Sequence, residues 1–367
     1  MNINRSVYTA AAALLAACMA PGTASAQNFM GFQYGASAGA VSQISVANLA
    51  QNWVVTGVRN SAGDLEMITW ESNGHALLRK GSATGKAIGN AGVATVALTS
   101  NLVVTAVVST GNLLEINAWF VNASGAVTPG SSVGQGEFSK SVRMTKLDSS
   151  RVLVAVENES GDLTITLWTV SSTGVVSGNG NKVTGAGASI ASIAAMSGSQ
   201  AITAIRNSTG DLQLDSWSVS GSDIIAHQAT ASAGAVSQLD ITAWNAGHVA
   251  TPVSNGSSDL ELIDWIVNPS TGAITRHSSA TVGVAGQVAA STVGDLILTA
   301  SLNSSGNVDA GVWGYNGTQI AAGDSAQEEA ADLVAAAPLS TGLYSVTATR
   351  TAAGDLKLDV WSGDYVP

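Results

Sequence analysis

The stretch "RNSAGDLEMITW" at residues 59–70 decides the fold, because near copies of it return at regular intervals. Residues 206–217 read "RNSTGDLQLDSW", and residues 350–361 read "RTAAGDLKLDVW". The tryptophans that end seven such copies follow one another at 49, 49, 49, 48, 48 and 48 residues: Trp70, Trp119, Trp168, Trp217, Trp265, Trp313 and Trp361. A period close to 50 built from short β-forming segments indicates repeated small sheets rather than a helical solenoid.

Each copy is predicted to hold four short strands. In the first copy they are "VSQISV" (41–46), "VVTGVRN" (54–60), "DLEMITW" (64–70) and the looser "ALLRKGSAT" (76–84). Apolar residues alternate along the third strand, and a period of two is the signature of a strand. The "NSAGD" segment before it consists of turn formers, so a hairpin with three to five loop residues around a type I turn is expected.

The tryptophan that ends each third strand is predicted to belong to the core. A large residue at one fixed position of every copy is expected to wedge between neighbouring sheets, although an aromatic platform for sugar stacking is the alternative. The second strand carries a small residue, such as Gly57 or Ala106. In six copies a threonine precedes this position: Thr56, Thr105, Thr203, Thr251, Thr299 and Thr347.

The phase of the repeats predicts how the first and last copies meet. The last copy lacks a fourth strand, whereas "NFMGFQYGASAGAVSQ" (28–43) parallels "IIAHQATASAGAVSQ" (224–238). The N-terminal strand is therefore expected to close the ring as the outer strand of the last sheet, which removes exposed edges. Residues 27–367 resemble an all-β, seven-bladed β-propeller of four-stranded antiparallel blades. They lack the WD40 and Kelch signatures. They match the sialidase Asp box only in part, because Gly precedes Asp and the spacing to Trp differs. No catalytic residue therefore carries over from those families.

Residues 1–26 have the form of a secretory signal peptide, with Arg5, an apolar run and "ASA" before Gln27. This predicts an exported bacterial protein, secreted or periplasmic, with one mature domain at residues 27–367. The sequence "LAAC" at residues 15–18 also fits a lipoprotein cleavage box. An outer-membrane lipoprotein anchored through Cys18 is therefore the alternative localisation.

The composition excludes several classes of function. Cys18 is the single cysteine, so the mature chain has no internal disulfide, no thiol nucleophile and no cysteine-based zinc site. The net charge is −11 and charged residues make up 11% of the chain. Without a basic patch, nucleic acid and anionic membranes are not expected partners. Outside residues 1–26 no apolar run is long enough for a transmembrane helix.

An acidic residue recurs after the "NSAG" turn and is the first candidate for chemistry. Asp64, Asp162, Asp211, Asp259 and Asp355 occupy it, and Asn112 and Asn307 are assigned to the remaining copies. Oxygen ligands for calcium or sugar hydroxyls are one interpretation. Turn chemistry is the favoured one, because Asn substitutes for Asp and the hairpins lie far from the axis. No cofactor is predicted, and calcium alone stays open.

Arginines and two out-of-register tryptophans are the predicted binding residues. Arg59, Arg206 and Arg350 stand five residues before the repeated Asp. They either pair within their own hairpin or grip a carboxylate or sulfate of a ligand. Trp53 and Trp244 lie outside the repeat register near strand ends, which favours exposed contacts.

The four histidines indicate no metal site. His227 and His277 are assigned one shared outer-strand position, together with Lys80, which predicts a solvated face. No pair of the four has a recognised zinc spacing. Nucleophile-elbow, phosphate-loop and dinucleotide-binding motifs are also missing.

The favoured function is a non-catalytic binding protein, lectin-like or protein-binding, that uses loops on one face to hold a glycan or an envelope or extracellular protein. It rests on near-identical repeats without a catalytic constellation. The alternative is a lyase or hydrolase at the mouth of the central channel. Residues of the first strands would then form its site: Gln43, Lys140, Arg143, Gln238 and Asp240.

Overall fold

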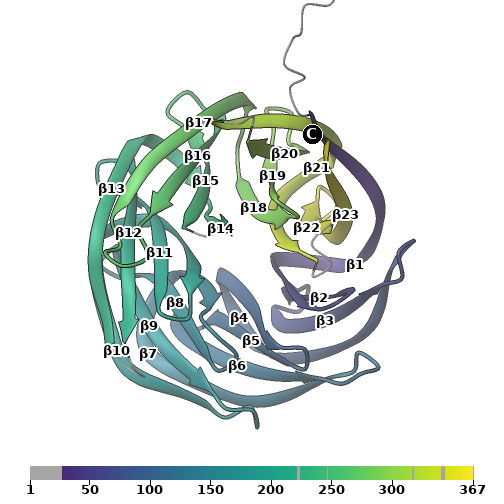
Figure 1. Cartoon of the computed structure of the whole chain (residues 1–367). Helices are drawn as coiled ribbons and strands as arrows, with labels where there is room; N and C mark the ends of the chain where they lie inside the picture. Colours follow the sequence, from purple (N-terminus) through teal and green to yellow (C-terminus); the bar gives the residue numbers. More distant parts are fainter. Residues whose placement is uncertain (1–26, 221–223, 246, 316–317, 340–343, 367) are drawn as a thin grey trace, which may run out of the picture.

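The computed structural model describes residues 27–220, 224–245, 247–315, 318–339 and 344–366, and in these ranges every regular element is a β-strand. The predicted signal peptide and Cys18 lie outside the described residues. The strands surround an open centre as a ring (Figure 1). Within the described ranges, no helix has the length and apolar character needed to cross a membrane. The expectation of an all-β propeller architecture is confirmed.

Hydrogen bonds group the strands into antiparallel ladders, which we number after the repeat tryptophan each contains. Ladder 1 consists of β1 (Gln27–Ala50), β2 (Trp53–Asn60), β3 (Asp64–Ser72) and β4 (Leu77–Thr99). Ladder 2 consists of β4, β5 (Leu102–Ser109), β6 (Leu113–Val121) and β7 (Val127–Lys146). Ladder 3 consists of β7, β8 (Arg151–Asn158), β9 (Asp162–Val170) and β10 (Val176–Ser197).

The remaining ladders follow the same plan. Ladder 4 consists of β10, β11 (Gln200–Asn207), β12 (Asp211–Ser220) and β13 (Ile224–Leu239). Ladder 5 consists of the end of β13 with β14 (Thr242–Asn245), then β15 (His248–Asn255), β16 (Asp259–Val267) and β17 (Ile274–Val284). Ladder 6 consists of β18 (Val288–Val293), β19 (Leu296–Leu302), β20 (Asn307–Tyr315) and β21 (Ile320–Pro338).

The N-terminal strand takes part in the last ladder as well as the first. Ladder 7 consists of β21, β22 (Tyr344–Thr351), β23 (Asp355–Val366) and the first half of β1. Residues 27–40 of β1 pair with β23, and residues 41–50 pair with β2. Most other long strands are shared in the same way, because each leaves one ladder as its outer strand and enters the next as its inner strand.

The hairpins between second and third strands have the expected turn. Gly63 donates its N–H to the Asn60 carbonyl at 2.9 Å and has a φ of 87°, a left-handed conformation that glycine adopts without steric cost. The Asn60 side chain accepts the backbone N–H of Asp64 at 3.0 Å. This arrangement recurs at Asn158, Asn207, Asn255 and Asn303. We call the face that carries these hairpins the hairpin face.

One sequence assignment in these hairpins is wrong by one residue. Asn112 does not replace the repeated aspartate, because it has a φ of 61° and occupies the left-handed position of Gly63. Leu113 begins the third strand in this copy. Asn tolerates the left-handed region better than most residues, which explains how this copy dispenses with glycine there.

The repeat tryptophans are buried, as predicted, with at most 2% of their surface exposed. Each indole N–H is also paired. Trp70 Nε1 donates to Thr56 Oγ1 at 3.0 Å, and the same bond joins the five other tryptophans whose second strand carries the threonine. The repeated threonine is therefore the acceptor that lets an indole enter the core without an unpaired N–H.

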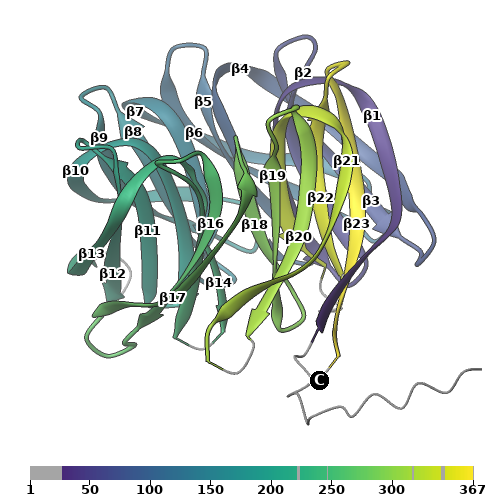
Figure 2. The ribbon, with the colours of Figure 1, turned by 90° about the horizontal axis from the view of Figure 1, so that it is seen from above.

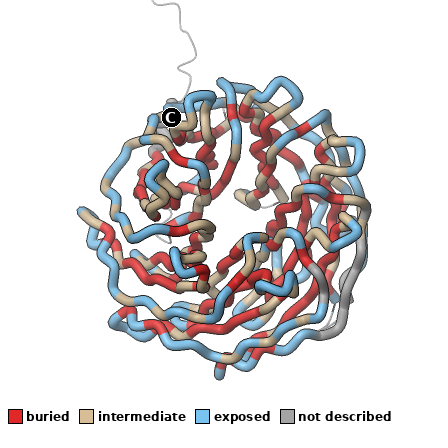
Figure 3. The backbone as a smooth tube through the Cα atoms, turned by 180° about the vertical axis from the view of Figure 1, so that it is seen from behind, coloured by how far each residue is buried: buried red, intermediate tan, exposed pale blue. Residues whose placement is uncertain are grey.

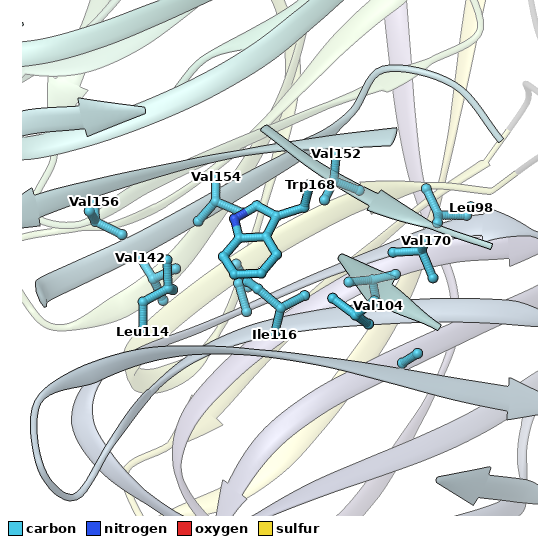
Figure 4. Close-up of a cluster of buried hydrophobic side chains, with 14 of the residues drawn as sticks. Leu98, Val104, Leu114, Ile116, Val142, Val152, Val154, Val156, Trp168 and Val170 are labelled. Atoms are coloured by element: carbon cyan, nitrogen blue, oxygen red, sulfur yellow. The ribbon is translucent and has the colours of Figure 1, made fainter. Parts of the chain in front are cut away.

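Ladder 3 departs from this pairing and shows its importance. Val154 replaces the threonine, and Trp168 instead donates to Thr166 Oγ1 at 2.9 Å. Figure 4 shows Trp168 among Val152 and Val154 of its own ladder and Leu114 and Ile116 of ladder 2. The tryptophan thus lies between adjacent ladders, as the sequence predicted.

Burial decreases from the inner strands to the rim. The second strand β5 is buried along nearly its whole length, whereas the outer strand β17 is mostly exposed. Figure 3 shows buried residues concentrated along the interior strands and exposed residues along the outer rim. Seen from above in Figure 2, the ladders stand side by side with their turns at the two faces. The apolar core therefore lies between the ladders, and a polar site is to be sought at the rim, at the two faces or in the central channel.

Candidate functional site

The inner strands enclose a cavity of about 520 Å³ at the centre of the ring. Its wall includes Gln43, Arg143, Gln238 and Asp240, four of the five residues that the sequence placed at the channel mouth. Gln43 is paired with Arg59, at the end of β2, so this part of the channel lies toward the hairpin face. The sequence could locate these residues because they hold equivalent positions of the first strands.

Asp240 is the acidic group of this cavity, and it links three ladders. Its Oδ1 accepts a hydrogen bond from Ser192 Oγ at 2.7 Å, and its Oδ2 accepts the backbone N–H of Ala290 at 2.9 Å. Burial raises the pKa of the Asp240 carboxyl above its usual range, although these two bonds and the charge of Arg143 act in the opposite direction. The carboxylate is therefore costly to hold here and is kept in place by backbone and side-chain donors.

Unpaired acceptors line the same cavity. Gln43 Oε1 and Thr95 Oγ1 are buried and have no hydrogen-bond partner among the described residues. A buried acceptor without a partner costs about 1–3 kcal/mol, so its presence in a cavity wall needs an explanation. Arg143 supplies donors beside them, and its Nη1 is held by the Val142 carbonyl at 3.0 Å. Thr95 Oγ1 is directed at Gly57, where an added Cβ would lie 2.3 Å from it, whereas Gln43, Arg143 and Asp240 all belong to the wall of this cavity.

Lys140, the fifth residue expected at the channel mouth, lies elsewhere. It lines a second cavity of about 730 Å³ with Arg59 and Glu159. Its Nζ is 3.7 Å from Glu157 Oε1, and its side chain is about half exposed. This cavity is more open, and none of the described residues in its wall carries a buried unpaired atom, so we take the central cavity as the candidate site.

The three predicted binding arginines are not brought together. Arg59 donates Nε to the Ile88 carbonyl at 3.0 Å and Nη1 to Ser42 Oγ at 2.9 Å. Arg206 makes the equivalent bonds to Val236 and Ser189 in its own part of the ring. Each guanidinium thus connects its second strand to two long strands, the one that enters its own ladder and the one that enters the next. It does not pair with the acidic residue of its own hairpin.

Arg350 differs in having an acidic partner. Its Nη2 is 2.6 Å from Asp332 Oδ2, and its Nη1 donates to the Ser42 carbonyl at 3.3 Å. The three arginines lie at the ends of second strands on the hairpin face, which is the face that the sequence predicted for binding.

The two predicted tryptophans lie toward the face opposite the hairpin face, because they stand at the other ends of the inner strands. Trp53 begins β2, and a Cβ on Gly125 would lie only 2.7 Å from its ring, so the next ladder's turn packs against it. Trp244 stacks on Tyr315 with ring centroids 5.3 Å apart. Both side chains are partly buried, so neither forms one site with the arginines.

A second polar cluster was missed by the sequence analysis. Asp264 is fully buried directly before Trp265, and it accepts hydrogen bonds from His248 Nδ1 at 3.0 Å and His277 Nδ1 at 2.9 Å. The shared position assigned to His227 and His277 is wrong. His227 pairs with Trp217, whereas His277 is the extra residue of a bulge between the pairs of Asp264 and Trp265. The available signal was Asp264 itself, a charged residue directly before a repeat tryptophan.

Comparisons with known proteins support the fold alone. The chain matches no protein-family model and no curated protein. Among solved structures, the WD40 domain of Toxoplasma gondii coronin is similar over 93% of this chain and 87% of its own, with a TM-score of 0.64 and 11% identity. A periplasmic gluconolactonase of Pseudomonas aeruginosa is similar over 78% of this chain and 85% of its own, with a TM-score of 0.58 and 12% identity.

A third structure, a protein from Lactobacillus plantarum, is similar over 82% of this chain and 96% of its own, with a TM-score of 0.57 and 12% identity. The coronin domain and the gluconolactonase have propeller-like folds, and one is a WD40 domain whereas the other is an enzyme. The chain therefore has a β-propeller fold, and its function must be argued from its own sites.

Proposed function

We propose that this protein is an exported, seven-bladed, non-catalytic β-propeller that binds a small hydroxyl-rich ligand, a sugar residue of a glycan, in the central cavity. The polar side chains of the cavity wall, Gln43, Arg143 and Gln238, carry the proposal. Ligand hydroxyl groups would bond the side-chain amides of the two glutamines, and the Arg143 guanidinium would donate to ligand oxygens. The cavity volume of about 520 Å³ is in the range that holds small molecules.

The proposed blades are the seven ladders of the described residues. Each contributes one inner strand to the channel, so a ligand there would contact several repeats at once. Pairing of β1 with β23 supports a ring closed by the N-terminal strand. Hydrogen bonds from a hydroxyl-rich ligand would replace those that the cavity's polar groups otherwise make to water, and their fixed directions would give selectivity.

The same cavity supports a hydrolase or lyase as the second candidate. The specific observation is the buried Asp240 carboxyl in the cavity wall beside Arg143, because burial raises its pKa and general acids are commonly carboxyl groups with a raised pKa. Against this candidate, both Asp240 oxygens already accept hydrogen bonds from protein groups. We therefore favour binding without turnover.

A glycan array screened with purified residues 27–367, with and without calcium, tests the proposal. We expect binding of a defined glycan, reduced at least tenfold in affinity by Gln43→Ala and by Arg143→Met. Arg276→Met is the matched control, because Arg276 lies on the outer strand β17 and pairs with Glu261 at 2.6 Å. Binding that occurs only with calcium would add a cation to the site.

Mass spectrometry of the bound glycans separates the two candidates. Unchanged glycans after long incubation support a binding protein, whereas cleaved or rearranged products with wild type but not Asp240→Asn would establish the enzyme. A blank array with a folded sample would overturn the sugar proposal. Fractionation of cells and determination of the mature N-terminus test export and the Cys18 alternative: Gln27 is the expected first residue.

A further inference from the structure

We propose that His248, Asp264 and His277 form a binding site for one divalent transition-metal ion, with Zn²⁺ as the expected occupant. One ligand atom from each of the three residues lies within 4.8 Å of the other two, and we take the atoms to be His248 Nδ1, His277 Nδ1 and a carboxylate oxygen of Asp264, which already lie at hydrogen-bond distance. Two imidazoles and one carboxylate are a ligand set that zinc and related ions bind, with further positions left for water. This site is separate from the central cavity.

The first argument is the position of Asp264 in the repeat. The residue directly before the repeat tryptophan is uncharged in the six other copies: Thr69, Ala118, Leu167, Ser216, Val312 and Val360. In ladder 4 the hydroxyl of Ser216 donates to the Gly272 carbonyl of the next ladder at 2.7 Å. A carboxylate at such a buried position loses its hydration and requires strong partners. Asp264 is 0% exposed, so its charge must be matched locally.

The second argument is that unrelated parts of the chain converge on this carboxylate. His248 is the first residue of β15, and its Nδ1 lies 3.0 Å from Oδ1 and 3.2 Å from Oδ2. His277 reaches Oδ2 at 2.9 Å because the bulge in β17 turns it inward. Metal bonds of about 2.0–2.2 Å in tetrahedral geometry place neighbouring ligand atoms roughly 3.3–3.6 Å apart, a few tenths of an ångström more than these nitrogen–oxygen separations.

The third argument is the support around the ligands. Trp244 Nε1 donates to Asp264 Oδ1 at 3.4 Å, and the Tyr315 hydroxyl donates to Oδ2. Groups that hold metal ligands by hydrogen bonds fix their orientation. The stacked rings of Trp244 and Tyr315 also form an aromatic wall beside the imidazoles.

Access is compatible with reversible binding. The His248 and His277 side chains are 24% and 36% exposed, whereas the carboxylate between them is inaccessible. In the bound state each neutral imidazole would use Nδ1 for the ion and carry its proton on Nε2.

Ladder 4 supplies an internal control. His227 Nε2 lies 3.1 Å from Asp215 Oδ1, but the third partner there is the Thr230 hydroxyl instead of a second imidazole. An isolated His–Asp pair of this kind is an ordinary hydrogen-bonded contact. If the Asp264 cluster is also only a set of hydrogen-bonded contacts, the two clusters should respond alike to metal ions.

Titration of chelator-treated, tag-free protein (residues 27–367) with Zn²⁺ tests the site. We expect one Zn²⁺ per chain by elemental analysis, and a loss of affinity of at least about 100-fold in His248→Gln and in His277→Gln. His227→Gln should bind as wild type does. Fewer than one ion per chain, or equal binding by wild type and His277→Gln, would overturn the proposal and leave a hydrogen-bonded cluster.

Nuclear magnetic resonance of the imidazole nitrogens needs no variant and covers the case in which a substitution prevents folding. The chain has four histidines. Addition of Zn²⁺ should shift the Nδ1 signals of His248 and His277 and leave those of His75 and His227 unchanged. Shifts confined to His75 or His227, or none at all, would contradict the site.

Discussion

Ladders 4 and 5 are neighbours built from the same repeat, yet they treat the position before the tryptophan differently. Both bury the indole and pair its N–H with a threonine, Thr203 in one and Thr251 in the other. Ladder 4 then has Ser216, whose hydroxyl needs one acceptor. Ladder 5 has Asp264, which accepts hydrogen bonds from side chains of four strands. A single change from hydroxyl to carboxylate thus accompanies an entire polar cluster, because a buried charge requires more partners than a buried hydroxyl.

The largest expected effect comes from moving the carboxylate into the wrong ladder. Ser216→Asp places a buried charge against the Gly272 carbonyl without the imidazoles, phenol or indole that Asp264 has. We expect the free energy of unfolding to fall by about 3–5 kcal/mol, measured by urea denaturation at pH 7.5.

Ser216→Ala is the control for this variant and should cost only about 1 kcal/mol, because it removes one hydrogen bond and adds no charge. If Ser216→Asp were as stable as Ser216→Ala, the position would tolerate a carboxylate anywhere in the ring. The partners of Asp264 would then have no special role.

A second buried carboxylate, Asp359, sharpens the comparison because its partners are incomplete. It is 1% exposed, and its Oδ1 has no hydrogen-bond partner among the described residues, although Oδ2 is 3.2 Å from Lys357 Nζ. Burial and then the nearby Glu328 raise the Asp359 pKa to about 6, while Lys357 lowers it and Glu329 adds a smaller increase. The folded state therefore binds this proton more tightly than the unfolded chain does.

The expected consequence is a loss of stability between about pH 4 and pH 6. The contribution of protonated Asp359 is complete below the unfolded pKa near 3.9 and disappears as the pH rises through the folded value, at most about 3 kcal/mol in all. Asp359→Asn should remove this dependence, so its free energy of unfolding relative to wild type should increase across the same interval. Parallel pH profiles of the two proteins in urea denaturation would contradict the pKa shift.

The smallest effect tests what the two ladders share. Thr203→Val keeps the shape of the side chain but leaves Trp217 Nε1 buried without its acceptor at 2.9 Å. The expected cost is about 2 kcal/mol in urea denaturation. Thr203→Ser, which keeps the hydroxyl, should cost less.

Ladder 3 extends this test to a different partner. Thr166→Val should cost about as much as Thr203→Val, because Thr166 is the acceptor for Trp168 where Val154 replaces the usual threonine. A neutral result at both sites would show that the indole N–H is satisfied in another way.

Local patterns made much of the fold predictable. Period-two alternation and turn residues identified the strands and hairpins, and the 48–49-residue spacing identified the repeat. Gln43, Arg143, Gln238 and Asp240 were also correctly placed together, because equivalent positions of a ring must meet at its axis. These inferences need only the repeat and the geometry of a strand.

The Asp264 cluster could not be predicted in the same way. His248 and His277 are 29 residues apart, and Tyr315 comes from the next ladder. A one-residue bulge in β17 decides whether His277 faces solvent or Asp264, and no turn signal marks it. The contacts of the arginines could not be predicted for a related reason, since they depend on the path of the neighbouring long strands.

The shared strands affect how the protein opens. Strand β4 ends one ladder and begins the next, and β1 connects the last ladder to the first. In an open solenoid the terminal repeats fray first, and amide protons there exchange with solvent sooner than those in the middle. Here the first and last ladders have no such free end. Protected amides throughout the ring should therefore exchange at one common slow rate, set by the opening of the whole molecule.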